Sequence, residues 1–339
     1  MNPTPRIAVA GATGAVGEAL LDILGERGFP FADLVPLASA RSAGGQVRCR
    51  GRDWTVRELD GFDFAGIDIA FFSAGGSVSA QHAPRAAAAG AVVIDNTSHF
   101  RNEPDVPLVV VEVNPEALKH RPRGIVANPN CSTMQMMVAL APLYREVGID
   151  RINVASYQSV SGAGRSAMEE LGLQTARLLN FQDAAPERFP VQIAFNLIPQ
   201  IDEFTDNGYT REEMKMVWET RKILGDPAIG VNPTCVRVPV FYGHALACHI
   251  ETRQPITPER ARAVLAAAPG VVVVDEHRPG GWPTPVTHAA GSDPVYVGRV
   301  RADPSHPRGL ALWIVADNIR KGAALNAVQL AEILVKDVA

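Results

Sequence analysis

The chain has 339 residues, of which 47% are hydrophobic and 20% are charged, and this length suggests two domains. The composition supplies enough apolar material for a large core and excludes general disorder. Lys and Arg total 32 against 36 Asp and Glu, and a net charge of −4 gives no overall attraction to nucleic acid or to an anionic membrane. No apolar run of 18 residues and no secretion-signal pattern occurs, so we expect a cytoplasmic protein with no nucleic-acid or membrane partner.

The cysteines and histidines give no sign of a disulfide framework or a metal centre. The four cysteines stand far apart, at positions 49, 131, 235 and 248, and form no CxxC pair. His244, Cys248 and His249 form the one His/Cys cluster, and their spacing matches no common zinc signature. We therefore expect a reducing compartment and no bound metal.

The first third of the chain alternates short apolar strands with helical segments. Such alternation is typical of a parallel sheet that helices cover on both faces. Residues 44–45 and 55–64 look like loops or edge structure. The expected strands are 6–10, 34–38, 67–72 and 91–95, and the expected helices are 14–24 and 78–90.

A second section begins near Asn130 and contains adjacent strands with fewer helices between them, which favours an antiparallel or mixed sheet. Pro142 is expected to kink or end the first helix of this section. Residues 181–210 are mixed and Pro-rich, and the chain closes with an amphipathic helix at 322–338. The other expected helices are 132–147, 167–180 and 211–224, and the expected strands are 151–157, 234–240, 245–251, 271–275 and 309–316.

A glycine-rich turn, Gly11-Ala-Thr-Gly-Ala-Val-Gly17, follows the first expected strand and opens the first helix. Glycines in this place allow a tight turn and a close approach of the backbone to a pyrophosphate, which would sit at the helix N-terminus. The alternative is a turn that serves only helix–sheet packing. The strand–turn–helix context favours dinucleotide binding, and a second Gly-rich turn, Ser73–Ser77, would line the same crevice.

Cys131, in Asn128-Pro-Asn-Cys-Ser-Thr133, stands where a loop meets a helix. A thiol at a helix N-terminus feels the positive end of the helix dipole, which favours the thiolate, although an inert buried cysteine is the common alternative. A thiol nucleophile needs an acid or base partner, and His244 follows a glycine at a strand-to-strand turn. A histidine in such a place is often structural. Together with the dinucleotide site, this pair nevertheless points to oxidation of an aldehyde through a thioester.

Seven segments resemble the motifs of the bacterial aspartate-semialdehyde dehydrogenases, in the same order and over essentially the whole chain. The Asn-Cys-Ser and Arg-x₆-His pieces are the most specific of them. The segments are 11–17, 73–79, Asp95-Asn-Thr-Ser-His-Phe-Arg101, 128–134, Ser156-Tyr-Gln-Ser-Val-Ser-Gly162, 237–244 and Asp317-Asn-Ile-Arg-Lys-Gly-Ala-Ala324.

The resemblance implies that Cys131 is the acyl-thioester nucleophile, that Gln158 orients and binds the substrate near the thiol, and that His244 is the acid/base. It also implies roles in substrate binding for Arg237, which would grip the α-carboxylate, and for Glu212, which would bind the ammonium group. It further implies that the phosphate is bound by Arg101, Asn130 and Lys215. The cofactor residues expected from the glycine turns and the matching motifs are Gly11, Thr13, Gly14, Ala15, Val16, Gly17, Ser73, Gly75, Ser161, Gly162 and Asn318, to which the segment after the second strand adds Arg41 and Ser42.

Elementary chemistry supports several of these roles and leaves alternatives open. Glu212 and Lys215 are three residues apart on an expected helix, so they share a face, but a solvated surface ion pair would look the same. Arg237 lies on an apolar strand, where a charge must be paired or must face a site, and its planar fork suits a carboxylate. Arg101 follows a strand end and could also be an ordinary loop arginine.

The segment after the second strand predicts NADP rather than NAD. NAD-binding units usually place an acid at the end of this strand, to bond the ribose 2′-hydroxyl. Here Ser39-Ala-Arg-Ser-Ala43 follows instead, and Arg41 and Ser42 offer a guanidinium and a hydroxyl to a 2′-phosphate. The alternative is a solvated loop arginine.

The expected fold is α/β: a Rossmann-like NADP-binding domain at 1–129, on which the helix at 318–339 packs back, and an α+β catalytic and dimerisation domain with a mixed sheet at 130–317. The expected activity is the reversible, NADP-dependent reductive dephosphorylation of L-aspartyl-4-phosphate to L-aspartate 4-semialdehyde, in lysine, threonine and methionine biosynthesis. The only expected partners are small-molecule substrates and a second copy of the chain, in a homodimer. The alternatives are an N-acetyl-γ-glutamyl-phosphate reductase-like enzyme, which has no need for Glu212, and a non-catalytic dinucleotide-binding protein.

Overall fold

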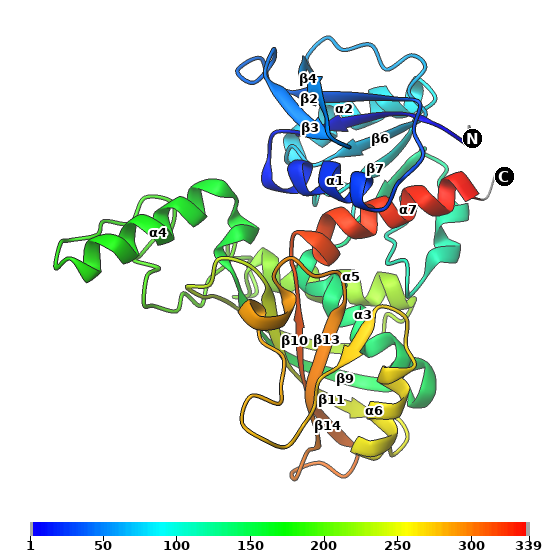
Figure 1. Ribbon diagram of the computed structural model, residues 1–339. Helices are drawn as coiled ribbons and strands as arrows, with labels where there is room; N and C mark the ends of the chain where they lie inside the picture. The colour runs from blue at the N-terminus through cyan, green and yellow to red at the C-terminus, as the bar shows by residue number, and fades with distance from the viewer. Residues whose placement is uncertain (1–2, 337–339) are drawn as a thin grey trace. The chain divides into compact units, whose positions relative to one another are not determined.

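The computed structural model describes residues 3–336 and divides them into two compact units (Figure 1). The first unit consists of residues 3–130 and 323–336, and the second of residues 131–322. Residues 318–322 thus group with the second unit, whereas the sequence placed them with the C-terminal helix. The part of that expected helix beyond residue 336 lies outside the described residues.

The first unit is built on a parallel sheet of six strands in the order β5-β2-β1-β6-β7-β8. The chain moves outward from β1 and then returns to place β6 on the other side of β1, so the strand order reverses between β1 and β6. In doubly wound sheets this is the position where ligands bind. The strands are β1 (Arg6–Ala10), β2 (Asp33–Ala38), β5 (Arg57–Glu58), β6 (Ile69–Phe72), β7 (Val92–Asp95) and β8 (Ile125–Ala127).

Helices α1 (Ala15–Glu26) and α7 (Leu325–Lys336) share one hydrophobic core with the apolar side chains of this sheet. Helix α2 (Gly76–Ala88) packs on β6, β7 and β8. The unit also contains a two-stranded hairpin, β3 (Gln46–Cys49) with β4 (Arg52–Thr55), and the 3-10 turn η1 (Pro115–Lys119). This architecture confirms the expected Rossmann-like α/β class.

The second unit has a mixed sheet of six strands in the order β10-β9-β11-β14-β13-β12. The outer pairs β10–β9 and β13–β12 are parallel, and the inner pairs are antiparallel. The expected mixed sheet is confirmed. Its strands are β9 (Ile149–Gln158), β10 (Gly230–Arg237), β11 (His244–Thr252), β12 (Val271–Val273), β13 (Val295–Ala302) and β14 (Gly309–Ala316).

Helix α3 (Cys131–Val147) packs on strands of this sheet and contacts both α5 (Arg211–Leu224) and α6 (Pro258–Ala266). It continues through Pro142 to Val147, so the proline does not end it early. Helix α4 (Arg165–Leu179) extends away from the sheet (Figure 1) and forms a small core of its own with the segment near Ile193. The remaining turns are η2 (Val160–Ala163), η3 (Pro285–Ala289) and η4 (Arg320–Ala324). No helix among residues 3–336 is long and apolar enough to cross a bilayer.

Candidate active site

Three of the residues implied by the resemblance meet at one edge of the second sheet. Gln158 is the last residue of β9 and lies opposite Arg237, the last residue of the parallel strand β10. His244 is the first residue of β11, which runs antiparallel beside β9, so it begins at the same edge. The turn before it contains Gly243 at φ 86°, a conformation that favours glycine. All three side chains are buried, with exposures of 2% for Gln158, 6% for Arg237 and 0% for His244.

Helix α5 adds a carboxylate to this edge. Its first turn is fixed by a capping box between Thr210 and Glu213, which leaves the neighbouring Glu212 facing inward and buried. Gln158 donates through Nε2 to Glu212 Oε1 over 3.1 Å, and Lys215 donates through Nζ to Oε2 over 3.1 Å. The burial of Glu212 argues against a solvated surface pair. Lys215 also forms an ion pair of 2.7 Å with Asp202, a partner that the sequence did not reveal.

The Arg237 guanidinium is held from one side by the protein backbone. Its Nη1 donates to the carbonyl oxygen of Ser159 over 2.8 Å. Burial lowers the pKa of Arg237, and the negative charges of Glu212 and Cys131 oppose that change. Arg237 therefore lies within electrostatic reach of both the Glu212 carboxylate and the Cys131 thiol.

Cys131 is the first residue of α3 and the only one of the four cysteines that is not buried. Gly322 packs directly against it, because a Cβ at that position would lie 2.7 Å from the Cβ of Cys131. By contrast, burial raises the pKa of Cys49, Cys235 and Cys248, which makes their thiolates unfavourable. Cys131 is thus the cysteine best placed to act as a nucleophile.

The His244 ring is buried and neutral. Burial first, and then the positive charge of Arg237, lower the pKa of His244 to about 3, while Glu212 acts in the opposite direction. Its Nδ1 lies 3.1 Å from the backbone nitrogen of Ser159, which donates to it. On the other side of the ring, a Cβ on Gly162 would lie 3.3 Å from Nε2 and 3.2 Å from Arg237 Nη1.

Of the cofactor residues implied in the second unit, Ser161 and Asn318 are buried and bonded to each other. Asn318 donates through Nδ2 to Ser161 Oγ over 3.0 Å, and its Oδ1 accepts from the backbone of Gly243 over 3.0 Å. Asn318 therefore ties the turn before His244 to the segment after Gln158.

The glycine turn of the first unit lies between β1 and α1, as expected. Gly11 has φ 88°, and a Cβ there would come within 3.0 Å of Ser73 in the turn after β6. A Cβ on Gly17 would lie 2.1 Å from the Gly11 carbonyl oxygen, so only glycine fits. The two turns thus lie together where the strand order reverses, and they form a cradle in which the backbone is exposed to a ligand. Thr13, Gly14, Ala15, Val16 and Gly75 belong to the same turns and helix starts.

Arg41 and Ser42 lie in the turn that follows β2, where no acid stands. Ser42 donates its backbone N–H to Ser39 O, and the Arg41 side chain is exposed, with no ion-pair partner among residues 3–336. Arg101 and Asn130 also belong to the first unit and are buried; Arg101 donates to Asn96 O over 2.9 Å. Lys215 belongs to the second unit.

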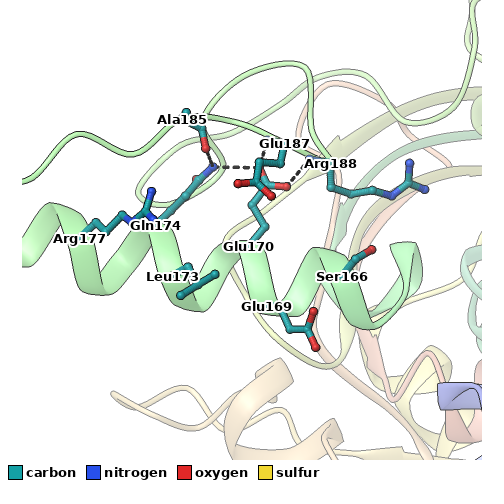
Figure 2. A pocket seen from close by; sticks show the side chains of 9 residues that line it. All are labelled: Ser166, Glu169, Glu170, Leu173, Gln174, Arg177, Ala185, Glu187 and Arg188. Carbon is teal, nitrogen blue, oxygen red and sulfur yellow. Dashed lines mark hydrogen bonds between the residues drawn. The ribbon is translucent and has the colours of Figure 1, made fainter.

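A separate pocket of about 310 Å³ lies between α4 and the chain that follows it (Figure 2). Glu170 accepts the backbone N–H groups of Glu187 and Arg188, and Gln174 donates to Glu170 over 2.9 Å. These bonds hold the loop on the helix. None of the residues implied by the resemblance lines this pocket, so it is not part of the candidate active site.

Comparison with known proteins identifies the family. Residues 6–121 match the family model described as semialdehyde dehydrogenase, NAD binding domain, and residues 140–321 match its dimerisation domain. A Legionella pneumophila protein named aspartate-semialdehyde dehydrogenase is 59% identical over 98% of this chain and 96% of its own length. The chain belongs to the aspartate-semialdehyde dehydrogenase family. This confirms the family expected from the motifs, and the comparisons give no support to the two alternatives.

Solved structures agree with this family assignment. The aspartate semialdehyde dehydrogenase II of Vibrio cholerae, solved in complex with ASA, has a TM-score of 0.96 and 58% identity, covering 98% of this chain and 99% of that one. The Candida albicans family member, solved with NADP, has a TM-score of 0.77 and 25% identity, covering 99% of this chain and 100% of that one. Nicotinamide-dinucleotide binding by the first unit is confirmed by the matching family domain.

Proposed function

We propose that this chain catalyses the reversible, NADP-dependent reductive dephosphorylation of L-aspartyl-4-phosphate to L-aspartate 4-semialdehyde. The observation that carries the proposal is a partly exposed thiol at the start of α3, within electrostatic reach of a buried Arg237 and Glu212. A nucleophile, an anion binder and a cation binder in one place match an acyl phosphate that bears both a carboxylate and an ammonium group.

Cys131 acts as the nucleophile in this proposal. Its thiolate attacks the acyl carbon, a C–S bond forms, and the C–O bond to phosphate breaks as phosphate leaves with the electron pair. The product is a thioester, and this covalent route divides one difficult step into two easier ones. The reduced cofactor, NADPH, would when bound supply the hydride that brings the thioester to the aldehyde level, and it would leave as NADP⁺. Cys131 then leaves as thiolate when the carbonyl re-forms.

The charged side chains divide the substrate between them. Arg237 donates a hydrogen bond through Nη1 to the carbonyl oxygen of Ser159. Its other N–H groups are suited to bind the α-carboxylate. Glu212, which already accepts from Gln158 and Lys215, suits the ammonium group. Lys215, Arg101 and Asn130 are proposed to bind the phosphate. An N-acetylated substrate has no free ammonium, so the Glu212 carboxylate would have no cationic group of the substrate to bind beyond its bonds to Gln158 and Lys215.

NADP is proposed to be held by the glycine turn, Ser73 and Gly75, with Ser161, Gly162 and Asn318 beside the reacting end. The cradle around Gly11 and Gly17, in which any Cβ would clash, supports this fit. The exposed Arg41 after β2 supports the choice of NADP over NAD, because it offers charge-assisted hydrogen bonds to a 2′-phosphate.

The chain is also proposed to form a homodimer through its second unit. It is proposed to act in the cytoplasm. Apolar side chains are exposed along α4 and the segment after it: Leu173, Leu179, Phe181, Val191, Phe195 and Leu197. Several exposed apolar side chains on one stretch of the chain support a protein interface. None of the four cysteines forms a disulfide, which supports a reducing compartment. A monomer in light scattering at micromolar concentration would contradict the dimer.

The decisive test compares NADPH oxidation with aspartyl-β-phosphate and with N-acetyl-glutamyl phosphate. We expect turnover with the first substrate only. Cys131→Ala should reduce that turnover at least about a thousandfold, or roughly 4 kcal/mol of barrier, and leave NADPH binding intact. Cys248→Ala is the matched control, because it removes a buried thiol from the same unit and should retain turnover. Turnover by Cys131→Ala above a thousandth of wild type would overturn the assignment. In addition, iodoacetamide should alkylate Cys131 rapidly, and substrate should protect it.

A further inference from the structure

Ser159 lies between Gln158 and the turn η2, and it is buried at 0% exposure. No role for it follows from the sequence alone. In the structure it makes two contacts with His244 Nδ1: its backbone nitrogen is 3.1 Å away and its Oγ is 3.0 Å away. One residue thus faces Nδ1 with both its backbone and its side chain.

The backbone contact determines which ring nitrogen can carry the proton. A backbone N–H is always a donor and cannot turn its hydrogen away, so the nitrogen that it faces must be an acceptor. If His244 Nδ1 were protonated, two hydrogens would point at each other over the 3.1 Å between the nitrogens. A neutral ring with an unprotonated Nδ1 carries its proton on Nε2.

The charges that face the ring favour the neutral form. Arg237 on β10 opposes a positive charge on His244, and Glu212 on α5 favours one. Burial of the ring adds to the effect of Arg237, and together they outweigh Glu212 and a contact with the Gly243 backbone, both of which favour the charged ring. The ring is therefore held neutral as well as in one tautomer.

The Ser159 hydroxyl fixes where the ring lies. A hydroxyl has one hydrogen to donate; with Nδ1 unprotonated it goes to Nδ1, and Ser159 Oγ accepts in turn from Ser161 Oγ over 3.1 Å. Asn318 donates through Nδ2 to Ser161 Oγ and accepts through Oδ1 from the backbone of Gly243, the residue before His244, both over 3.0 Å. Ser159 and Asn318 thereby connect the strand end after Gln158 to the turn that carries the histidine.

The other ring nitrogen of His244, Nε2, has different surroundings from Nδ1. His244 Nε2 has no hydrogen-bond partner among the described protein atoms, and the nearby Gly162 has no side chain to cover it. The Nε2–H group is therefore the donor that the ring can offer to a reacting atom.

We propose that Ser159 is a positioning residue that holds His244 as the Nε2–H tautomer, so that the histidine serves as a neutral hydrogen-bond donor to the carbonyl oxygen of the substrate. This inference deepens the proposed function and rests on it. It fits the chemistry because each tetrahedral oxyanion collapses by re-forming the C=O bond and expelling phosphate or the Cys131 thiolate. The oxygen needs a hydrogen bond in both steps but need not gain or lose a proton, so this inference gives His244 the role of a hydrogen-bond donor in place of the acid/base role that the resemblance implies.

The tautomer is tested by NMR of the full-length protein labelled with ¹⁵N-histidine, with His244→Asn as the variant that assigns the signal. We expect the His244 signal at about pH 7 to show a protonated Nε2 and an unprotonated Nδ1, and to show no titration between about pH 5.5 and 8. A proton on Nδ1, or a titration midpoint within that range, would overturn the inference. The spectrum needs no substrate, so it stands whether or not the proposed reaction is found.

The hydroxyl is tested by steady-state kinetics of Ser159→Ala. We expect kcat to fall about tenfold while KM for the substrate changes less than about twofold, since the hydroxyl acts on the donor and not on substrate binding. The matched control is Thr252→Val, which removes a buried hydroxyl at the far end of β11, bonded to Gln254 O and Arg308 O. It should leave kcat within about twofold of wild type. An unchanged kcat in Ser159→Ala, or an equal loss in the control, would refute the positioning role.

Discussion

The buried histidine should make the second unit less stable in mild acid, and His244→Gln should remove that effect. His244 has its pKa lowered to about 3 in the folded protein, against about 6.5 in an unfolded chain. Between these values the unfolded state binds a proton that the folded state does not. Stability therefore rises with pH across this window, is fully present above about pH 6.5, and is lost as the pH falls toward 3.

The magnitude follows from the two pKa values. At pH 7 the histidine is mostly neutral in both states. At pH 5 it is almost fully charged when unfolded and still neutral when folded, so the change from pH 7 to pH 5 costs roughly 2 kcal/mol through this residue alone. With the folded pKa well below 5, the figure is set by the unfolded pKa of about 6.5.

Urea unfolding followed by tryptophan fluorescence measures this cost. Trp218, Trp282 and Trp313 lie in the second unit and Trp54 in the first, so a Trp54→Phe background reports on the second unit alone. All other titrating groups are shared by the parent and His244→Gln, and their contributions cancel in the comparison. Between pH 7 and pH 5, the free energy of unfolding of the Trp54→Phe parent should fall by about 2 kcal/mol more than that of the same protein with His244→Gln. Equal losses in both proteins would show that His244 is not buried in its neutral form.

Two further substitutions test ligand binding. Arg237→Leu should weaken aspartate-semialdehyde binding by about 2–4 kcal/mol, and Arg237→Lys should restore only part of it, because an ammonium cannot copy the guanidinium fork; a lysine variant equal to wild type in KM and kcat would contradict the bidentate grip. Arg41→Ala should weaken NADPH binding about tenfold or more and barely change NADH binding in paired titrations. Equal losses for both cofactors would show that Arg41 does not bind the 2′-phosphate.

Elements with strong local signals were predictable from the sequence. The glycine turn predicted the β1–α1 unit, and helices α3, α4 and α5 lie within two residues of their expected bounds. Elements with weak signals were missed. The hairpin of β3 and β4 is polar and mostly exposed, so its pattern resembled a loop. Strand β13 contains Gly298 and a left-handed Arg299, which interrupt its register with β14.

Two short elements were also missed, for a different reason. Strand β8 has only the three residues Ile125–Ala127, and helix α6 only nine, although Thr257 and Pro258 mark its start. The C-terminal α-helix begins at Leu325 rather than at Gly322, because the chain first forms the π-turn η4. Short elements gain their stability from tertiary packing, which a local pattern does not contain.

In the candidate site too, features that depend on tertiary contacts could not be predicted from the sequence. Cys131 and Arg237 could be selected because a helix start and an apolar strand make their residue types unusual. The contact between the Ser159 backbone and His244 could not be predicted from the sequence. Every residue except proline has a backbone N–H, and only the fold determines where that group points. The packing of Gly322 on Cys131 likewise joins residues far apart in the chain.

The course of the chain between the two units has a consequence for its synthesis on the ribosome. Residues 3–130 emerge first, but α7 contributes Leu325, Val328, Leu330 and Leu334 to their core, and it is translated only after the whole second unit. The second unit is continuous in sequence and has all its residues as soon as Gly322 is made. We therefore expect the catalytic half to finish folding first, and the nucleotide-binding half to close around its last helix only when translation ends. A nascent chain released at Gly322 would carry Cys131 but would have an open hydrophobic face along α1, a surface that chaperones and proteases recognise.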